Sequence, residues 1–105
     1  MVIGYAYGSQ LRERAAYRFA CEDSIYVHPD HQGRGVGRAL LDALMPAAAA
    51  CGFRQMFAVI GDAANAGSIG LHARAGFTHE GAWRDAGYKF GRFLDVIHMQ
   101  RALIA

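Results

Sequence analysis

The chain contains the run Ile25-Tyr26-Val27-His28-Pro29-Asp30-His31-Gln32-Gly33-Arg34-Gly35-Val36-Gly37, which joins a predicted strand to a predicted helix through a glycine-rich turn. Pro29 cannot donate a ladder hydrogen bond, so the strand is expected to end at His28. Glycines let the backbone turn with its N–H groups converging, and a helix that begins there adds unpaired donors and a positive dipole end. This turn therefore predicts a site for a phosphate or pyrophosphate, to which Arg34 and Arg38 can add charge.

Two common phosphate-binding motifs do not match this turn. A P-loop ends in Gly-Lys-Ser/Thr, whereas Gly37 is followed by Arg38 and Ala39. A GxGxxG fingerprint that starts at Gly33 needs glycine at position 38, and one that starts at Gly35 needs glycine at position 40. The pattern that fits is Q-x-x-G-x-G from Gln32 to Gly37, which by itself is also compatible with a tight turn that binds nothing.

The flanking segments predict an α/β fold of the α+β kind, a mixed sheet with helices on its faces. The polar segment Ser9–Arg18 is expected to be a loop, Pro46 to kink or divide the first helix, and Gly52 to cap it. The predicted order is two strands, a helix, a strand, a helix and two strands. The strands are Val2–Tyr7, Phe19–Val27, Gln55–Ile60, Phe77–Trp83 and Leu94–Arg101, and the helices are Gly37–Ala50 and Ser68–Ala75.

Length and composition limit the classes of protein to consider. A chain of 105 residues with 53% hydrophobic and 19% charged residues predicts one globular domain, residues 1–105. A net charge of +2 without a basic run gives little support for nucleic acid or membrane binding. No segment has the length of a membrane span or the pattern of a signal peptide, so a cytoplasmic location is expected. Cys21 and Cys51 are interpreted as buried, reduced thiols, and no spacing predicts a metal site.

The quoted run resembles the coenzyme A segment of the GCN5-related N-acetyltransferase (GNAT) family. The run Asn65-Ala66-Gly67-Ser68-Ile69-Gly70-Leu71-His72-Ala73-Arg74-Ala75-Gly76-Phe77 resembles the second cofactor motif of that family. Ala58–Gly61 and the tail Gly87–Val96 resemble its phosphinothricin N-acetyltransferase branch. The resemblance extends from Val2 to Leu103. Members of the family begin with a strand, two helices and a further strand before the segment that opens here at Val2, so the resemblance implies an N-terminally truncated GNAT fold that keeps the C-terminal, cofactor-binding portion.

The resemblance implies acetyl-CoA as co-substrate, without a metal, and assigns roles to individual residues. The backbone of Ile25, Tyr26 and Val27 would pair with the pantetheine arm of the cofactor. Glu22 would be the general base, which acetyl transfer needs because an alkylammonium is mostly protonated near pH 7. His72 would relay that proton or help to protonate the leaving thiolate. The pyrophosphate segment is Gln32, Gly33, Arg34, Gly35, Val36, Gly37 and Arg38, with Asn65 and Ser68 as further cofactor contacts and Tyr88 and Lys89 as contacts to an anionic acceptor.

Each of these side chains also has a plainer interpretation. Glu22 alternates with strand neighbours and is also compatible with a solvent-facing position, and His72 with a hydrogen-bonded core histidine. Lys89 is also compatible with a solvated hairpin. The other histidines are interpreted as surface or structural residues, and the aromatic side chains of Trp83, Phe90 and Phe93 as core. Tyr5 and Tyr7 are expected to share one sheet face, because side chains alternate along a strand.

Two functions from different classes follow. The first is an enzyme that transfers acetyl from acetyl-CoA to the amino group of a small amino-acid-like acceptor, of the phosphinothricin or methionine sulfoximine type. The alternative is a truncated, non-catalytic acyl-CoA-binding module, or a half-domain that needs a partner chain. A short chain of this kind is expected to expose an apolar sheet face or edge and to form a homodimer.

Overall fold

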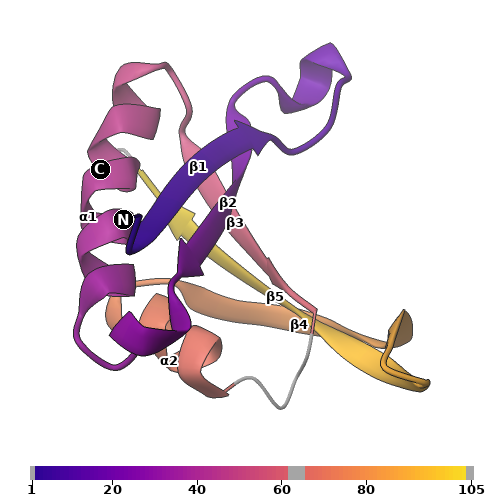
Figure 1. Ribbon diagram of the computed structural model, residues 1–105. Coiled ribbons are helices and arrows are strands. Elements are labelled where there is room, and N and C mark those ends of the chain that lie inside the picture. The colour runs from indigo at the N-terminus through magenta and orange to yellow at the C-terminus, as the bar shows by residue number, and fades with distance from the viewer. Residues whose placement is uncertain (1, 62–65, 104–105) are drawn as a thin grey trace.

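The computed structural model describes residues 2–61 and 66–103, which form one mixed sheet with two α-helices packed against it (Figure 1). The order of strands and helices along the chain is the predicted one. Within the described residues the strands lie in the order β1-β2-β3-β5-β4. The elements are β1 (Gly4–Gln10), β2 (Ala20–Val27), α1 (Val36–Ala50), β3 (Gln55–Ile60), α2 (Ala66–Arg74), β4 (Thr78–Lys89) and β5 (Arg92–Ala102), with short 3₁₀ turns at Ala15–Tyr17 and Pro29–His31.

The two middle strands, β2 and β3, are paired over only part of their length. β2 pairs antiparallel with β1 from Cys21 to Val27, and β3 pairs antiparallel with β5 over its whole length. The parallel pairing between β2 and β3 covers only three positions and ends at Glu22 and Phe57. Beyond that point the strands diverge, as Figure 1 shows, so one edge of each is left without a neighbouring strand. We call the space between Asp23–Val27 and Ala58–Ile60 the β2–β3 gap.

Both helices pack on the same face of the sheet, a detail that the predicted mixed sheet with helices on its faces did not specify. The core cluster joins Leu41 and Met45 of α1 to Met56 of β3 and to Ala75 and Phe77 at the end of α2. Leu41 and Met56 are fully buried, and burial of such a side chain stabilises a fold by about 1.5–3 kcal/mol. On the opposite face, which we call the open face, apolar side chains remain exposed: Tyr5, Tyr7, Tyr26, Val59 and Trp83.

The ends of the helices follow from particular residues. Pro46 lies inside α1 and does not divide it. The hydrogen bond that Pro46 removes is the one to the carbonyl of Asp42, and both residues are exposed, so water can satisfy that carbonyl. Gly52 follows α1 with φ +96° and Gly76 follows α2 with φ +93°, the left-handed conformation that ends helices. The predicted cap at Gly52 and the predicted end of the second helix at Gly76 are therefore confirmed.

Three predictions about individual side chains need correction. Cys51 is exposed at the C-terminal cap of α1, and only Cys21 is buried. Trp83, Phe90 and Phe93 are exposed rather than core residues. Trp83 lies on the open face, and Phe90 and Phe93 lie at the end of the β4–β5 hairpin, which projects beyond the helices (Figure 1). This hairpin is also longer than predicted, with bulges between His79 and Gly81 and between Trp83 and Gly87 that interrupt the alternation. The predicted common face of Tyr5 and Tyr7 is confirmed: both are exposed and Tyr5 stacks on Tyr26 of β2, with ring centroids 4.9 Å apart.

Candidate functional site

The glycine-rich turn places two residues in the left-handed conformation directly before α1. Gly33 has φ +76° and Gly35, the N-cap of α1, has φ +80°. L-residues with a side chain rarely adopt such angles, which accounts for the two glycines. A Cβ added at either position would meet no atom within 4 Å, so the surface above the turn is open. The turn is preceded by a short cap in which His28 Nδ1 accepts a hydrogen bond from the Asp30 amide (3.1 Å).

The backbone N–H groups of this turn lack partners. No side chain caps α1, and in the described part of the chain the amides from Gly33 to Arg38 donate to no other group. Unpaired amides at a helix N-terminus, together with the helix dipole, attract an anion. The turn therefore offers the unpaired donors that the predicted phosphate site requires.

A cavity of about 520 Å³ opens above these amides. It extends from the turn along Ile25 and Val27 of β2 to Ser68 and His72 of α2. Gly37 lets the two helices approach at its wall, since a Cβ there would lie 3.1 Å from Leu71 Cδ2. Among the predicted cofactor residues, the ones that line this cavity are Ile25, Val27, Gln32, Gly33, Gly35, Val36, Gly37, Arg38 and Ser68.

The two arginines of the turn differ in their surroundings. The Arg38 guanidinium donates to Asp42 Oδ1 (2.9 Å) and to the Arg74 carbonyl (3.0 Å), so it connects α1 to the end of α2. Its backbone amide, in the first turn of the helix, donates to no other group in the described part of the chain. Arg34 is exposed beside the turn and does not line the cavity.

A second cavity, of about 280 Å³, occupies the β2–β3 gap. Its walls are Glu22 to Tyr26 of β2 and Ala58 to Gly61 at the end of β3. Ile25, Ser68 and His72 line both cavities, so the two spaces adjoin along β2. The edge of β2 that faces the gap has no strand partner beyond Glu22, and its N–H and C=O groups are free to pair with an extended ligand.

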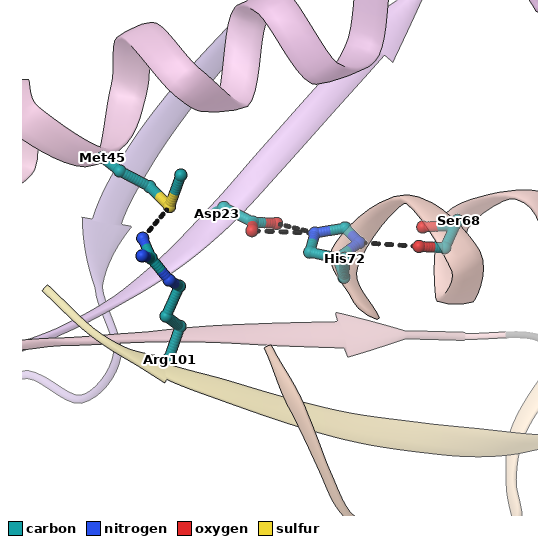
Figure 2. Close-up of polar contacts among 5 residues, drawn as sticks. All are labelled: Asp23, Met45, Ser68, His72 and Arg101. Atoms are coloured by element: carbon teal, nitrogen blue, oxygen red, sulfur yellow. Dashed lines mark hydrogen bonds and ion pairs between the residues drawn. The ribbon is translucent and has the colours of Figure 1, made fainter. Parts of the chain in front are cut away.

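The junction of the two cavities holds a buried ion pair, between Asp23 of β2 and His72 of α2 (Figure 2). His72 Nε2 lies 2.9 Å and 3.1 Å from the two carboxylate oxygens of Asp23. His72 Nδ1 donates to the Ser68 carbonyl (2.8 Å), and the Phe77 ring packs edge-on against the imidazole. Burial lowers the pKa of His72, but the hydrogen bond and charge of Asp23 outweigh it, so the net shift is upward from 6.5.

Asp23 was missed in the sequence, although a signal for it exists. Cys21, Asp23 and Ile25 alternate on the face of β2 that packs against the helices. A carboxylate on an otherwise apolar buried face needs a partner, and α2 supplies it. Arg101 is not that partner, because its guanidinium donates to Met45 Sδ (2.9 Å), as Figure 2 shows.

Glu22 lies on the other side of the same strand. Its neighbours in the alternation are Ser24 and Tyr26, whose side chains belong to the open face. Glu22 is half-buried and lines the second cavity together with His72. The structure thus brings the two predicted catalytic residues to one cavity, from opposite faces of the sheet.

The remaining predicted residues lie elsewhere. Tyr88 and Lys89 lie at the tip of the β4–β5 hairpin and line neither cavity; Tyr88 is 67% exposed, and the Lys89 ammonium lies over the Phe90 ring. Asn65 lies outside the described residues.

Burial and the charge of Asp23 raise the pKa of Cys21 to about 11, so this thiol stays protonated and is not a nucleophile. In residues 2–61 and 66–103, no three His, Cys, Asp or Glu side chains gather as metal ligands would.

The unpaired amides at the start of α1 and the separation of β2 from β3 are the features expected from the resemblance to the GNAT family. The model of the acetyltransferase (GNAT) family matches residues 1–77 of the chain. The chain therefore belongs to the GNAT family.

Two curated relatives and one solved structure illustrate the similarity. The phosphinothricin N-acetyltransferase of Alcaligenes faecalis is 47% identical over 99% of this chain. The L-methionine sulfoximine/L-methionine sulfone acetyltransferase of Salmonella typhimurium is 45% identical over 98%. The structure of yncA from Salmonella typhimurium, solved with its cofactor acetyl-CoA, matches with a TM-score of 0.96 and 44% identity over 100% of this chain and 60% of that one. The chain spans 53% and 60% of the length of the two curated relatives.

Proposed function

We propose that this chain binds acetyl-CoA and transfers its acetyl group to the amino group of a small amino-acid-like acceptor, of the phosphinothricin or methionine sulfoximine type. The observation that carries the proposal is the row of unpartnered amides from Gly33 to Arg38, which opens into a cavity that runs to an unpaired strand edge. The names of the two curated relatives support the acceptor class, and the acetyl-CoA bound to yncA supports the co-substrate.

The residues present fit acetyl-CoA. Its pyrophosphate would be held by the amides of the turn, where a Cβ at Gly33 or Gly35 would project into open space. The amide groups of its pantetheine arm would find partners on the β2 edge from Ile25 to Val27, in the manner of an added strand. Ser68, which lines both cavities, lies where the arm would pass, and Asn65 stays a predicted contact.

Acetyl-CoA supplies the acetyl group as a thioester, and the residues of the chain prepare the amine. An amine attacks a carbonyl only after it has lost its proton, and Glu22 is the carboxylate at the gap that faces the open side of the sheet. In this proposal the acceptor approaches from the open face and the co-substrate from the helix face. The two meet in the β2–β3 gap, where Glu22 and His72 share a cavity. The roles of Tyr88 and Lys89 toward the acceptor carboxylate remain predictions.

A thiol-release assay tests the proposed function. The chain is incubated with acetyl-CoA and a panel of phosphinothricin, methionine sulfoximine, methionine sulfone and proteinogenic amino acids, with the Alcaligenes faecalis relative as positive control. We expect release of coenzyme A that depends on at least one of the first three acceptors. Acetyl-CoA binding in calorimetry without acceptor-dependent release would contradict the enzyme and favour a non-catalytic acyl-CoA-binding module.

We also propose that the chain forms a homodimer and resides in the cytoplasm. Exposed aromatic side chains on the open face favour self-association, and two free cysteines suit a reducing compartment. No helix in the described residues has the length and apolar character needed to cross a membrane.

Sedimentation equilibrium at micromolar concentration is expected to give twice the chain mass of 11.4 kDa. Tyr7→Glu, which places a charge on the open face, should shift the mass toward that of one chain. Ala43→Glu, on the exposed side of α1, is the matched control and should leave the dimer intact. A single-chain mass for the unmodified protein at the highest concentration would refute the dimer.

A further inference from the structure

Asp23 and His72 are the buried polar side chains that the structure describes, and they meet where β2 and β3 separate. Asp23 directly follows Glu22, which is the last residue of β2 that pairs with β3. Its side chain is 5% exposed and that of His72 is 4% exposed. Along the part of β2 that no longer pairs with β3, the Asp23–His72 pair therefore connects β2 to α2.

The hydrogen-bond partners of His72 decide which of its nitrogens carry protons. The Ser68 carbonyl only accepts, so Nδ1 carries a hydrogen. A carboxylate also only accepts, and both oxygens of Asp23 are within 3.1 Å of Nε2. With Asp23 ionised, Nε2 carries a hydrogen as well and the ring is an imidazolium. His72 then has no lone pair with which to take a proton from an amine.

The position of the pair would allow the positive charge of His72 to stabilise a transition state. His72 lines both cavities, at the place where the acyl end of a co-substrate anchored at the Gly33–Arg38 amides would reach the gap. Negative charge develops on the carbonyl oxygen and on the leaving sulfur during acyl transfer from a thioester. A fixed positive charge beside that point, in a partly enclosed site, stabilises such a transition state.

We propose that Asp23 is a positioning residue that holds His72 as an imidazolium at the junction of the two cavities, so that His72 serves as a fixed positive charge and not as the base. This inference rests on the proposed acetyl transfer and gives the residues separate roles. Glu22 accepts the proton of the amine, and the Asp23–His72 pair stabilises the negative charge that forms on the thioester.

The groups that surround His72 on the neighbouring elements leave Asp23 as its charged partner. Phe77, packed on the ring from the side of β4, and Ala58 and Ile60 of β3 are apolar. The titratable and charged residues that line either cavity with His72 are Glu22, Asp23 and Tyr26 of β2, His31 before α1, Arg38 of α1 and Arg74 of α2. Of these, Asp23 is the one within hydrogen-bond distance of the ring.

Nitrogen NMR of the ¹⁵N-histidine-labelled protein tests the charge directly, without reference to activity. The chain has five histidines, and His72→Gln assigns the signal of interest. We expect both ring nitrogens of His72 to be protonated at pH 7, and the ring to lose its second proton at a higher pH than the exposed histidines do. In Asp23→Asn the ring should lose its second proton at lower pH. A neutral ring in the unmodified protein at pH 7 would overturn the proposal.

Kinetics test the positioning role. Asp23→Asn should lower kcat roughly 10- to 100-fold, in the range of a lost electrostatic contact in an active site, while the KM for acetyl-CoA changes little. Asp23→Glu, which keeps the charge, should restore part of kcat. Asp85→Asn, an exposed residue of β4, is the matched control and should behave as the unmodified chain.

The outcomes separate this inference from the proposed function. An unchanged kcat in folded Asp23→Asn would refute the positioning role. If the spectrum shows that the asparagine variant does not fold, the protonation state of His72 in the unmodified protein decides the proposal, and a neutral ring refutes it. Absence of any thiol release, together with an imidazolium signal for His72, would refute the proposed function and the catalytic use of the pair, but not the charge state.

Discussion

Gly35→Glu is expected to weaken acetyl-CoA binding by at least ~100-fold, which corresponds to about 2.7 kcal/mol. Gly35 is the N-cap of α1 and lines the cavity above the unpartnered amides, and a Cβ added there would meet no protein atom within 4 Å. A carboxylate there would accept hydrogen bonds from those amides and would repel a pyrophosphate in the same space. Charge-assisted hydrogen bonds contribute about 1.5–3 kcal/mol each, so the loss of two or three accounts for the expected effect. Titration calorimetry with acetyl-CoA measures it.

Backbone strain at Gly35 needs its own control, since φ +80° is costly for any residue with a side chain. Gly52→Glu provides it. Gly52 has φ +96°, its added Cβ would also meet nothing within 4 Å, and it lies at the other end of the same helix. Both variants should lose similar thermal stability, and only Gly35→Glu should lose affinity. Equal affinity in all three proteins would show that the turn does not hold the pyrophosphate.

Local patterns in the sequence were sufficient for the elements that form the site. The strand Gln55–Ile60 was predicted with the bounds that the structure shows, because a short apolar run between glycine-containing segments is a local property. The turn from Gln32 to Gly37 was predicted because only glycine adopts φ +76° and +80° without cost. The hairpin from Arg84 to Phe93 was not, because its bulges and the positive φ of Asp85 and Phe90 break the period of two.

Features that depend on contacts between distant segments were missed. Asp23 and His72 are 49 positions apart, and nothing near either residue identifies the other as its partner. The packing of both helices on one face depends on how the sheet is assembled, so alternation alone did not predict it. For the same reason Trp83 and Phe93 were expected in the core: an aromatic residue on a strand indicates an apolar face, but not whether anything covers it.

Glu22 lies on the opposite face of the sheet from the Asp23–His72 pair, so its contribution to kcat can be tested separately with Glu22→Gln. Glu22→Gln keeps the size of the side chain and removes its ability to accept a proton. General-base catalysis contributes typically 10²–10⁴-fold, and we expect a fall in kcat of about that size. The KM for acetyl-CoA should change little, because the amides and the strand edge that would hold the co-substrate are unaltered. Initial rates of thiol release, with saturating acceptor, measure both constants.

The pH dependence of this variant distinguishes a base from a residue that only shapes the cavity. As pH rises, more of the acceptor amine is already neutral, so the deficit of Glu22→Gln should shrink steadily at alkaline pH. A residue that only packs against the acceptor would give a deficit of constant size. Glu13→Gln, which removes an exposed carboxylate in the loop between β1 and β2, is the control for a general change in charge and should leave the profile unchanged. Because Asp23 already holds the proton-accepting nitrogen of His72, no second base at the gap is expected to rescue Glu22→Gln near neutral pH.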